Sequence, residues 1–314
     1  MKNFALIGAS GYIAPRHMKA ILETNNNLIA AFDPYDGIGI IDSYFPECNF
    51  FTEFERFDRF LEKLVRVDNK SVDYIVITSP NYLHDAHIKF ALRYGANVIC
   101  EKPIVLNPHN LNQLIEIEKE SKYKVYNILQ LRLHPDIAKL KKKIDNEIKD
   151  NPLKKYEIDL TYITSRGKWY FSSWKGDETK SGGIATNIGI HFFDMLTWIF
   201  GDVLENEVYF KEIDTSSGFL KLKYANVRWF LSINKKFIER SDKKTNRSIL
   251  VNSEELEFSE GFENLHTFSY EKILENEGFG ILEAKSSLNI VSEIRNKKSI
   301  PFNESNSHPL LKKI

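Results

Sequence analysis

The sequence predicts an α/β protein in which a parallel sheet flanked by helices is followed by a second α/β domain with a mostly antiparallel, open sheet. Over residues 1–130, short apolar runs alternate with helical patterns, which is typical of strand–helix–strand units and a parallel sheet. From residue 155 the apolar residues recur at every second position instead. The length of 314 residues also fits two domains better than one.

In the first domain, residues 1–130, each expected strand is a short apolar run bounded by glycine or by polar residues. The predicted strands cover 4–7, 28–32, 73–77, 97–100 and 124–128. The predicted helices cover 13–23, 54–66, 84–94 and 108–122. Gly95 stands where a helix commonly ends in a left-handed residue.

The second domain, residues 131–314, begins with a predicted helix over 136–149, and Asn151-Pro152 follows as a joint. Period-two patterns and short apolar runs predict strands that start at 155 and recur at 206–211, 218–224, 226–234, 248–252 and 255–258. An apolar helix over 184–200 interrupts them and ends at Gly201. Helices over 266–276 and 281–297 close this domain.

Composition narrows the possible partners. Lys plus Arg and Asp plus Glu both number 43, so the basic excess that nucleic-acid binders usually carry is absent and nucleic acid is not an expected partner. The most apolar stretch, 188–200, is too short to span a bilayer, so no membrane association is expected. Cys48 and Cys100 are the only cysteines, and Met1 leads straight into a strand; we therefore expect a reduced, cytoplasmic protein without a signal peptide.

A glycine loop follows the first expected strand. The segment Gly8-Ala9-Ser10-Gly11-Tyr12-Ile13-Ala14 places glycines where backbone can approach a pyrophosphate, and the next helix supplies N–H groups at its N-terminus. Asp33 ends the second strand, where an acid accepts hydrogen bonds from the ribose 2′-OH of NAD and repels a 2′-phosphate. Asp36 is close by and could share this role. Strand, loop, helix and acid together predict a Rossmann domain that binds NAD.

Lys102 follows the strand 97–100 within the tripeptide Glu101-Lys102-Pro103. Open α/β sheets bind ligands at the carboxyl ends of their strands, so this lysine is placed to meet one. Burial or a nearby cation lowers the pKa of a lysine amine towards neutrality, where the amine becomes a useful base. Taken alone, however, a lysine is more often a solvated surface charge.

Asn187 and His191 are four residues apart on the helix 184–200, so they share one face. A single histidine among aromatic residues is usually a satisfied core residue. Here Asn187 adds a second polar group, and Ser181-Gly182-Gly183 makes a glycine-rich entry to the helix. We therefore expect this face to meet a ligand.

The segment from Tyr162 to Lys180 mixes cations with aromatic rings. Guanidinium forks onto phosphate or carboxylate, and an indole or phenol ring can stack on a base or a sugar. The alternative is a surface loop with rings packed beneath it. Arg166, Trp169 and Tyr170 are the expected contacts to a charged, ring-bearing ligand.

Several motifs in this order resemble one family. The glycine loop, Ser79-Pro80-Asn81 with His84, Glu101-Lys102-Pro103, and Gly189-x-His191-x-x-Asp194 together resemble the glucose–fructose oxidoreductase and inositol dehydrogenase (Gfo/Idh/MocA) family. The segments 11–17, 42–46, 167–170 and 186–194 are similar to the bacterial UDP-N-acetylglucosaminuronate 3-dehydrogenases of O-antigen biosynthesis. Asn187 departs from the wider family, in which many members carry aspartate, so a substrate hydrogen bond is expected there rather than a proton relay.

The resemblance implies an NAD-dependent sugar-nucleotide dehydrogenase that oxidises the C3 hydroxyl of UDP-N-acetylglucosaminuronic acid during lipopolysaccharide O-antigen synthesis. Lys102 and His191 would be catalytic, with Lys102 as the first choice for the base, and no metal is expected. The implied cofactor-binding residues are Gly8, Gly11, Tyr12, Ile13, Asp33, Ser79, Pro80, Asn81, His84, Glu101, Lys102 and Gln130. The implied substrate-binding residues are Lys102, Tyr162, Arg166, Trp169, Tyr170, Asn187 and His191.

The same resemblance implies a homo-oligomer, a dimer or a tetramer, whose keto product passes to a PLP-dependent aminotransferase. Two alternatives stay open at this point. The chain could act on another sugar or polyol, which would need no diphosphate clamp. It could also be a non-catalytic NAD-sensing protein on the same scaffold, which would not need both a lysine and a histidine at these places.

Overall fold

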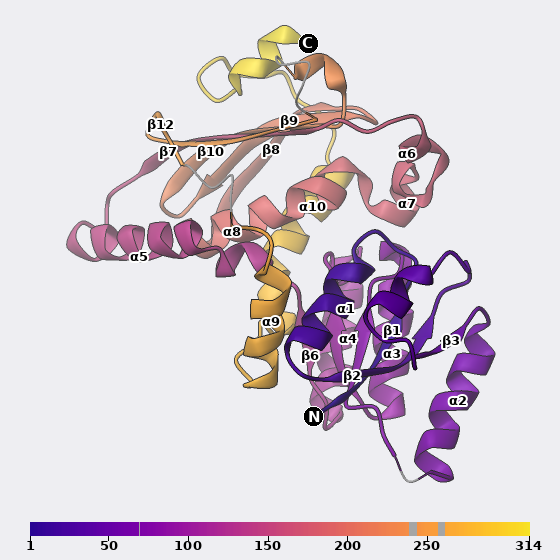
Figure 1. Ribbon diagram of the computed structural model, residues 1–314. Coiled ribbons are helices and arrows are strands. Elements are labelled where there is room, and N and C mark those ends of the chain that lie inside the picture. The colour runs from indigo at the N-terminus through magenta and orange to yellow at the C-terminus, as the bar shows by residue number, and fades with distance from the viewer. Residues whose placement is uncertain (69, 239–243, 257–260) are drawn as a thin grey trace. The chain divides into compact units, whose positions relative to one another are not determined.

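Two compact units make up the chain in the computed structural model, which describes residues 1–314 except 69, 239–243 and 257–260 (Figure 1). The first unit comprises residues 1–130 and 263–284, and the second comprises 131–262 and 285–314. Each unit is built on one six-stranded sheet. The predicted α/β class, with one parallel and one mostly antiparallel sheet, is confirmed.

The sheet of the first unit is entirely parallel, with the strand order β3-β2-β1-β4-β5-β6. Its strands are β1 (Asn3–Ile7), β2 (Asn27–Phe32), β3 (Asn49–Phe51), β4 (Tyr74–Ile77), β5 (Asn97–Cys100) and β6 (Val125–Asn127). The order reverses between β1 and β4. Ligands of open parallel sheets bind at such a reversal, at the carboxyl ends of the strands.

Helices cover both faces of this sheet. They are α1 (Ala14–Glu23), α2 (Phe54–Arg66), α3 (His84–Tyr94), α4 (Pro108–Glu120) and α9 (Leu265–Leu274). The helices α1 and α9 pack on the face that carries Phe4, Leu6 and Tyr74. Right-handed crossovers in this strand order place α2, α3 and α4 on the other face.

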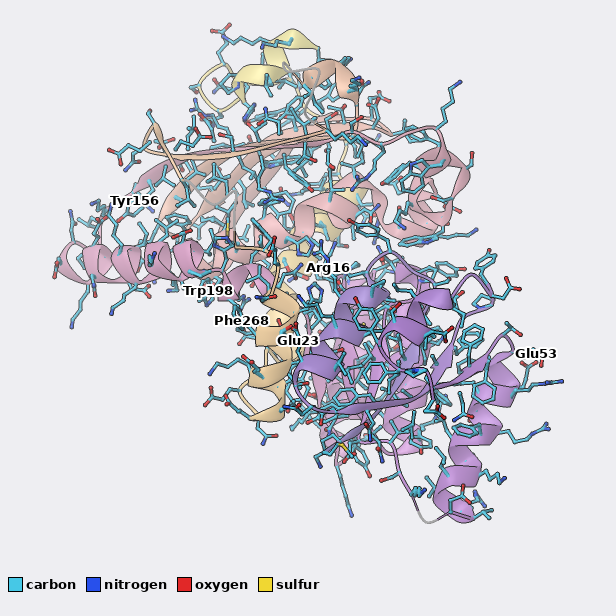
Figure 2. All side chains as sticks on the ribbon, in the orientation of Figure 1. Arg16, Glu23, Glu53, Tyr156, Trp198 and Phe268 are labelled. Atoms are coloured by element: carbon cyan, nitrogen blue, oxygen red, sulfur yellow. The ribbon has the colours of Figure 1, made fainter. Side chains whose placement is uncertain are left out.

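Helix α9 joins the first unit although it comes late in the chain. Its Thr267 donates a hydrogen bond to Glu23 of α1 (2.6 Å), and its Tyr270 packs against Phe4 of β1. Figure 2 labels Glu23 on α1 and Phe268 on the neighbouring α9. The sequence-based boundary after residue 130 assigned 263–284 to the second domain, whereas the structure groups this segment with the first unit. The reason is that α9 buries its apolar residues Tyr270 and Ile273 on the parallel sheet.

The sheet of the second unit has the order β12-β11-β7-β10-β9-β8, and every pairing is antiparallel except β7 with β10. Its strands are β7 (Tyr156–Thr164), β8 (Val203–Lys211), β9 (Thr215–Leu222), β10 (Ala225–Ser232), β11 (Thr245–Val251) and β12 (Glu254–Glu255). The end of the strand expected over 255–258 lies outside the described residues.

The two faces of this second sheet are covered differently. Helices α5 (Pro135–Asp150), α8 (Ile190–Phe200) and α10 (Lys285–Asn296) lie on one face (Figure 1). On the other face, Leu310 packs against the cluster around Phe230, and Leu311 packs against Tyr209 and Phe219. The C-terminal segment thus closes part of the face that the helices leave uncovered.

The sequence patterns missed the short elements. They did not indicate β3, nor the helices α6 (Trp169–Ser172) and α7 (Glu178–Ser181), because three or four residues are too few to show a period. The helix expected over 184–200 begins with a π-helical turn over Ala185–Gly189, and α8 follows it. Among the described residues, no helix is long and apolar enough to cross a membrane.

Candidate functional site

The glycine loop lies against the loop that follows β4. Gly8 adopts φ +97°, and a Cβ built on it would lie 2.5 Å from the backbone nitrogen of Ser79. No side chain fits there, so this position requires glycine. Gly11 continues the turn, and its N–H donates to the Gly8 carbonyl (3.2 Å). Ile13 is the N-cap residue of α1, and Tyr12 beside it is 88% exposed.

Asp33 is buried directly after β2, and its carboxylate is tied to the glycine loop. One oxygen accepts the N–H of Ser10 (3.0 Å), and the other accepts the N–H of Tyr35 (3.0 Å). These two bonds fix the orientation of the carboxylate. An acid held next to the glycine loop is the arrangement that recognises the ribose of a dinucleotide.

Two histidines, one fully buried and one partly buried, support the loop Ser79-Pro80-Asn81. His84 is fully buried; its Nδ1 lies 2.7 Å from the Pro103 carbonyl and its Nε2 lies 2.8 Å from the Ser79 carbonyl. Both ring nitrogens therefore have protein partners, so His84 holds the loops after β4 and β5 together, and any role in cofactor binding is indirect. Ser79 itself bonds His87 (2.9 Å).

Glu101 and Lys102 follow β5 at the same edge of the sheet. Lys102 is partly buried, its N–H donates to the Glu101 carboxylate (3.2 Å), and its peptide bond to Pro103 is cis. The other Glu101 oxygen is bonded to His17 (3.1 Å) and His266 (3.0 Å). Glu101, expected at the cofactor, is thus committed to protein groups.

Two buried acceptors lie near the end of β6. The side-chain oxygens of Asn127 and Gln130 have no hydrogen-bond partner within the part of the chain that the structure describes. Buried polar atoms are almost always paired, so these two point to donors from a ligand. Gln130 was predicted as a cofactor residue, whereas Asn127 was missed; a polar residue closing an apolar strand was the available signal.

In the second unit, Asn187 lies in the π-helical turn and donates a hydrogen bond to the Tyr170 hydroxyl (2.7 Å). The turn thereby joins two of the predicted substrate residues. His191 follows in the first turn of α8 and is partly buried. Turns of this type are rare and occur frequently at functional sites.

The cationic, ring-bearing segment is only partly exposed. Tyr170 is buried, whereas Arg166 and Trp169 are exposed, the latter to 55%. Lys175 lies 4.4 Å from the ring centre of Trp174, and burial, followed by the charge of Arg166, lowers the pKa of its amine. Desolvated cations of this kind gain most from an anionic partner.

A cavity of about 320 Å³ adjoins this segment within the second unit. Its lining includes Tyr170, Lys175, Glu178, Gly182, Lys211 and Arg295. Burial lowers the pKa of Arg295, while the charge of Glu178 opposes this shift. The cavity lining thus combines three cations with carboxylates and one aromatic ring.

The sequence patterns did not indicate two arginines of the second unit, Arg132 and Arg247, whereas Asp194 was part of the family motif. Arg132 makes a buried, two-pronged ion pair with Asp194 of α8 (3.0 and 2.7 Å). It also lies 5.8 Å from the ring of Trp198, which is labelled in Figure 2. Arg247 lies over the rings of Tyr162 (5.7 Å) and Phe262 (4.3 Å). No local sequence signal pairs residues so far apart in the chain.

A parallel sheet with a glycine loop at its strand-order reversal and a fixed acid on the next strand defines a dinucleotide-binding protein. Residues 2–128 match the family described as "Oxidoreductase family, NAD-binding Rossmann fold", and residues 141–221 match its "C-terminal alpha/beta domain". The chain belongs to this Gfo/Idh/MocA oxidoreductase family, as its motifs predicted, and its cofactor is NAD.

Solved structures extend this likeness. The chain is 48% identical to the WlbA (WbpB) dehydrogenase from Thermus thermophilus, solved with NAD and UDP-GlcNAcA; the match covers 99% of this chain and 100% of that one, with a TM-score of 0.93. The WlbA dehydrogenase from Bordetella pertussis shares the fold at 17% identity over 96% of this chain and 98% of that one, with a TM-score of 0.76.

Curated relatives are more distant. The oxidoreductase YteT of Bacillus subtilis (strain 168) is 27% identical over 64% of this chain and 47% of its own length. Inositol 2-dehydrogenase of Rhizobium meliloti (strain 1021) is 30% identical over 42% of this chain and 37% of its own length. The matched part of this chain therefore spans less than half the length of these relatives.

The residues at the strand ends of the first unit fit NAD. Gly8 has no side chain at a point where a Cβ would collide with the backbone of Ser79. Asp33 offers a carboxylate of fixed orientation to the ribose. The side-chain oxygens of Asn127 and Gln130 have no hydrogen-bond donor among the described residues. In a bound NAD, the pyrophosphate would lie against the glycine loop, a ribose hydroxyl would donate to Asp33, and an amide N–H would donate to Asn127 or Gln130.

Proposed function

We propose that this protein oxidises the C3 hydroxyl of UDP-N-acetylglucosaminuronic acid to the 3-keto sugar, with NAD as the oxidant. One observation carries the proposal: the end-to-end match, at 48% identity, to a dehydrogenase solved with NAD and UDP-GlcNAcA. The match covers 99% of this chain and 100% of the other. Identity at this level makes a shared substrate class the simplest expectation.

The anionic substrate has a counterpart in the second unit. UDP-GlcNAcA carries a diphosphate and a carboxylate, which guanidinium and ammonium groups bind well. We assign this binding to Arg166 and Lys175, with Trp169 and Tyr170 against the ring-bearing parts of the substrate. The cavity beside Tyr170 and Lys175 supports this assignment. Tyr162, Asn187 and His191 complete the proposed substrate contacts.

The chemistry divides between cofactor and side chains. NAD, when bound, accepts the hydride that leaves C3. The side chains then have to remove the hydroxyl proton, and we assign that proton to Nζ of Lys102. His191 hydrogen-bonds the same hydroxyl or shares the proton. A positioned general base contributes about 10²–10⁴-fold to such a step.

We further propose the setting of the reaction. The keto sugar would pass to a PLP-dependent aminotransferase on the route to a 2,3-diacetamido uronic acid of the O-antigen. The enzyme would work in the cytoplasm as a homo-oligomer, a dimer or a tetramer. These assignments rest on the resemblance to the O-antigen dehydrogenases.

A substrate panel tests the proposed function. Purified protein is mixed with UDP-GlcNAcA, UDP-GlcNAc, free N-acetylglucosaminuronic acid and myo-inositol, and NADH is followed by its absorbance. We expect rapid reduction of NAD with UDP-GlcNAcA alone and inhibition by added UDP. Reduction by a free sugar or polyol that UDP does not inhibit would indicate the broader dehydrogenase alternative. Tight NAD binding without reduction by any compound would indicate the sensing alternative.

A further inference from the structure

Four buried side chains form a hydrogen-bonded cluster beneath Lys102 in the first unit. His17 comes from α1, Glu101 follows β5, and His266 and Tyr270 come from α9. His17 and Tyr270 are fully buried, and Glu101 and His266 are 7% and 3% exposed. The imidazole rings of His17 and His266 meet edge to face, with centroids 5.0 Å apart.

The donors and acceptors of the cluster fit one protonation pattern. One Glu101 oxygen lies 3.1 Å from Nε2 of His17 and 3.0 Å from Nε2 of His266. An ionised carboxylate only accepts, so both imidazoles donate Nε2–H to it. Nδ1 of His17 lies 2.8 Å from the Tyr270 hydroxyl. In a neutral His17 that donates Nε2–H, Nδ1 carries no hydrogen and accepts from this hydroxyl.

The electrostatics agree with this pattern. Burial would raise the pKa of Glu101, but the hydrogen bonds from His17 and His266 hold that pKa well below its usual range. Burial lowers the pKa of His17, which keeps the imidazole neutral. Burial, together with the charge of Glu101, raises the pKa of the Tyr270 hydroxyl, which stays a donor.

The cluster reaches Lys102 through the second Glu101 oxygen, which accepts the Lys102 backbone N–H (3.2 Å). The carboxylate is therefore held at both ends and cannot turn away. A buried charge adds little stability compared with apolar packing of the same volume. The fold nevertheless places this carboxylate next to the lysine and surrounds it with three polar side chains.

We propose that His17, His266 and Tyr270 are positioning residues for Lys102 and act through Glu101. The two imidazoles fix the carboxylate, the carboxylate fixes the Lys102 backbone, and Tyr270 fixes the tautomer of His17. Helices α1 and α9 thus both set the direction in which the lysine leaves the strand. The expected effect of these residues on turnover rests on the proposed role of Lys102 as the base. Their effect on the orientation of the Lys102 backbone does not depend on that role.

The test uses a matched set of variants of the full chain with bound NAD. His266→Leu removes one of the two imidazole donors to Glu101, and His266→Gln restores an N–H of similar reach. Tyr270→Phe removes only the hydroxyl. Ser269→Ala is the control, because its hydroxyl bonds the Leu265 carbonyl on the same helix and does not contact the cluster.

The first readout is hydrogen exchange of the Lys102 amide, resolved by fragmentation mass spectrometry without substrate. We expect His266→Leu to speed this exchange by roughly tenfold, the equivalent of about one hydrogen bond. His266→Gln should return it close to the parent rate, Tyr270→Phe should give a smaller increase, and Ser269→Ala should leave it unchanged. Unchanged exchange in His266→Leu would overturn the proposal; if that variant does not fold, unchanged exchange in Tyr270→Phe would do so.

The second readout separates kcat from KM for UDP-GlcNAcA. We expect His266→Leu to lower kcat by roughly tenfold or more with KM unchanged, and His266→Gln to recover most of it. A loss of kcat without faster Lys102 exchange would count against positioning. If the parent protein does not act on UDP-GlcNAcA, the proposed function fails while the exchange measurement still decides the inference.

The metal content of the protein provides a third readout. Ligand atoms of His17, Glu101 and His266 lie within 4.8 Å of one another, a spacing that a cation could also use. The hydrogen-bond pattern predicts no bound cation. A divalent metal that is present at one per chain and is lost in His266→Leu would overturn the proposal that these side chains act as a hydrogen-bonded positioning cluster.

Discussion

Lys102 is the side chain on which the proposed chemistry depends most. It leaves the carboxyl end of β5 with its backbone N–H bonded to Glu101, and it is partly buried. A lysine in this position meets whatever binds at the strand ends. The proposal that it removes a proton is therefore specific and can be tested by truncation.

We expect Lys102→Ala to lower kcat with UDP-GlcNAcA by about 10²–10⁴-fold, because the general base is lost. NAD affinity, measured by calorimetry, should stay close to that of the parent. Lys119→Ala removes an exposed lysine paired with Glu116 and should leave both quantities unchanged. Near-normal turnover in Lys102→Ala would refute the assignment.

Asp33 decides the choice between NAD and NADP in this account. Asp33→Asn keeps an acceptor but removes the charge that repels a 2′-phosphate. We expect NAD affinity to fall by about ten- to hundredfold, in keeping with the loss of a hydrogen bond to a charged group, and NADP binding to improve relative to it. The matched control is Asp68→Asn, since Asp68 is an exposed aspartate of the same unit. An unchanged preference for NAD would contradict this role.

At the scale of elements, the π-helical turn depends on close packing against the second sheet. A Cβ on Gly189 would lie 2.5 Å from Cδ1 of Leu231 and 3.1 Å from the ring of Phe193, both fully buried. The missing side chain therefore allows the helix to approach β10. The close neighbour of Gly189 on this side is therefore Leu231 of the second sheet.

We expect Gly189→Ala to destabilise the protein by about 1–3 kcal/mol, because overpacking a filled core forces side chains off their rotamers. Thermal unfolding of the variant measures this loss. Gly39→Ala is the control, since a Cβ there meets nothing within 4 Å. Equal melting temperatures for the two variants would contradict the packing argument.

The C-terminal segment carries a pH-dependent contact with the second sheet. His308 accepts the Leu310 N–H at Nδ1 (3.2 Å), and its Nε2 lies 3.0 Å from the Thr161 hydroxyl. Burial lowers the pKa of His308 to about 4. Its neutral form therefore stabilises the folded state fully above the unfolded pKa of about 6.5, and this stabilisation is lost as pH falls towards 4.

We expect His308→Gln to flatten the fall in stability between about pH 6.5 and pH 4. The difference between parent and variant should reach up to about 3 kcal/mol, measured by urea unfolding across this range. His87, whose pKa burial also lowers to about 4, titrates in the same window, so only the difference between the two proteins isolates His308. Parallel stability curves would show that His308 does not contribute.

At the scale of the whole molecule, local patterns predicted most elements because apolar periodicity and helix ends are local. The helices over 54–66 and 84–94 and the strand over 97–100 have the predicted bounds. The Gfo/Idh/MocA family and the NAD cofactor, predicted from motifs at four places, are confirmed.

The features that could not be predicted from the sequence are contacts between residues far apart in the chain. His17 and Glu101 lie 84 positions apart, and Glu101 and His266 lie 165 positions apart, so no window of sequence shows that they meet. The same holds for Arg132 with Asp194 and for α9 on the parallel sheet. The π-helical turn was not predicted either. Gly189 in this turn packs against Leu231, which lies 42 positions further along the chain, so the local sequence does not show the contact.

The proposed function requires that the hydrogen on C3 of UDP-GlcNAcA be transferred to NAD. Purified protein is mixed with UDP-GlcNAcA carrying deuterium at C3, and the cofactor is analysed by mass spectrometry after a single turnover. We expect NADH that is one mass unit heavier, together with a 3-keto sugar. Unlabelled NADH, or no NADH at all, would contradict the proposed function.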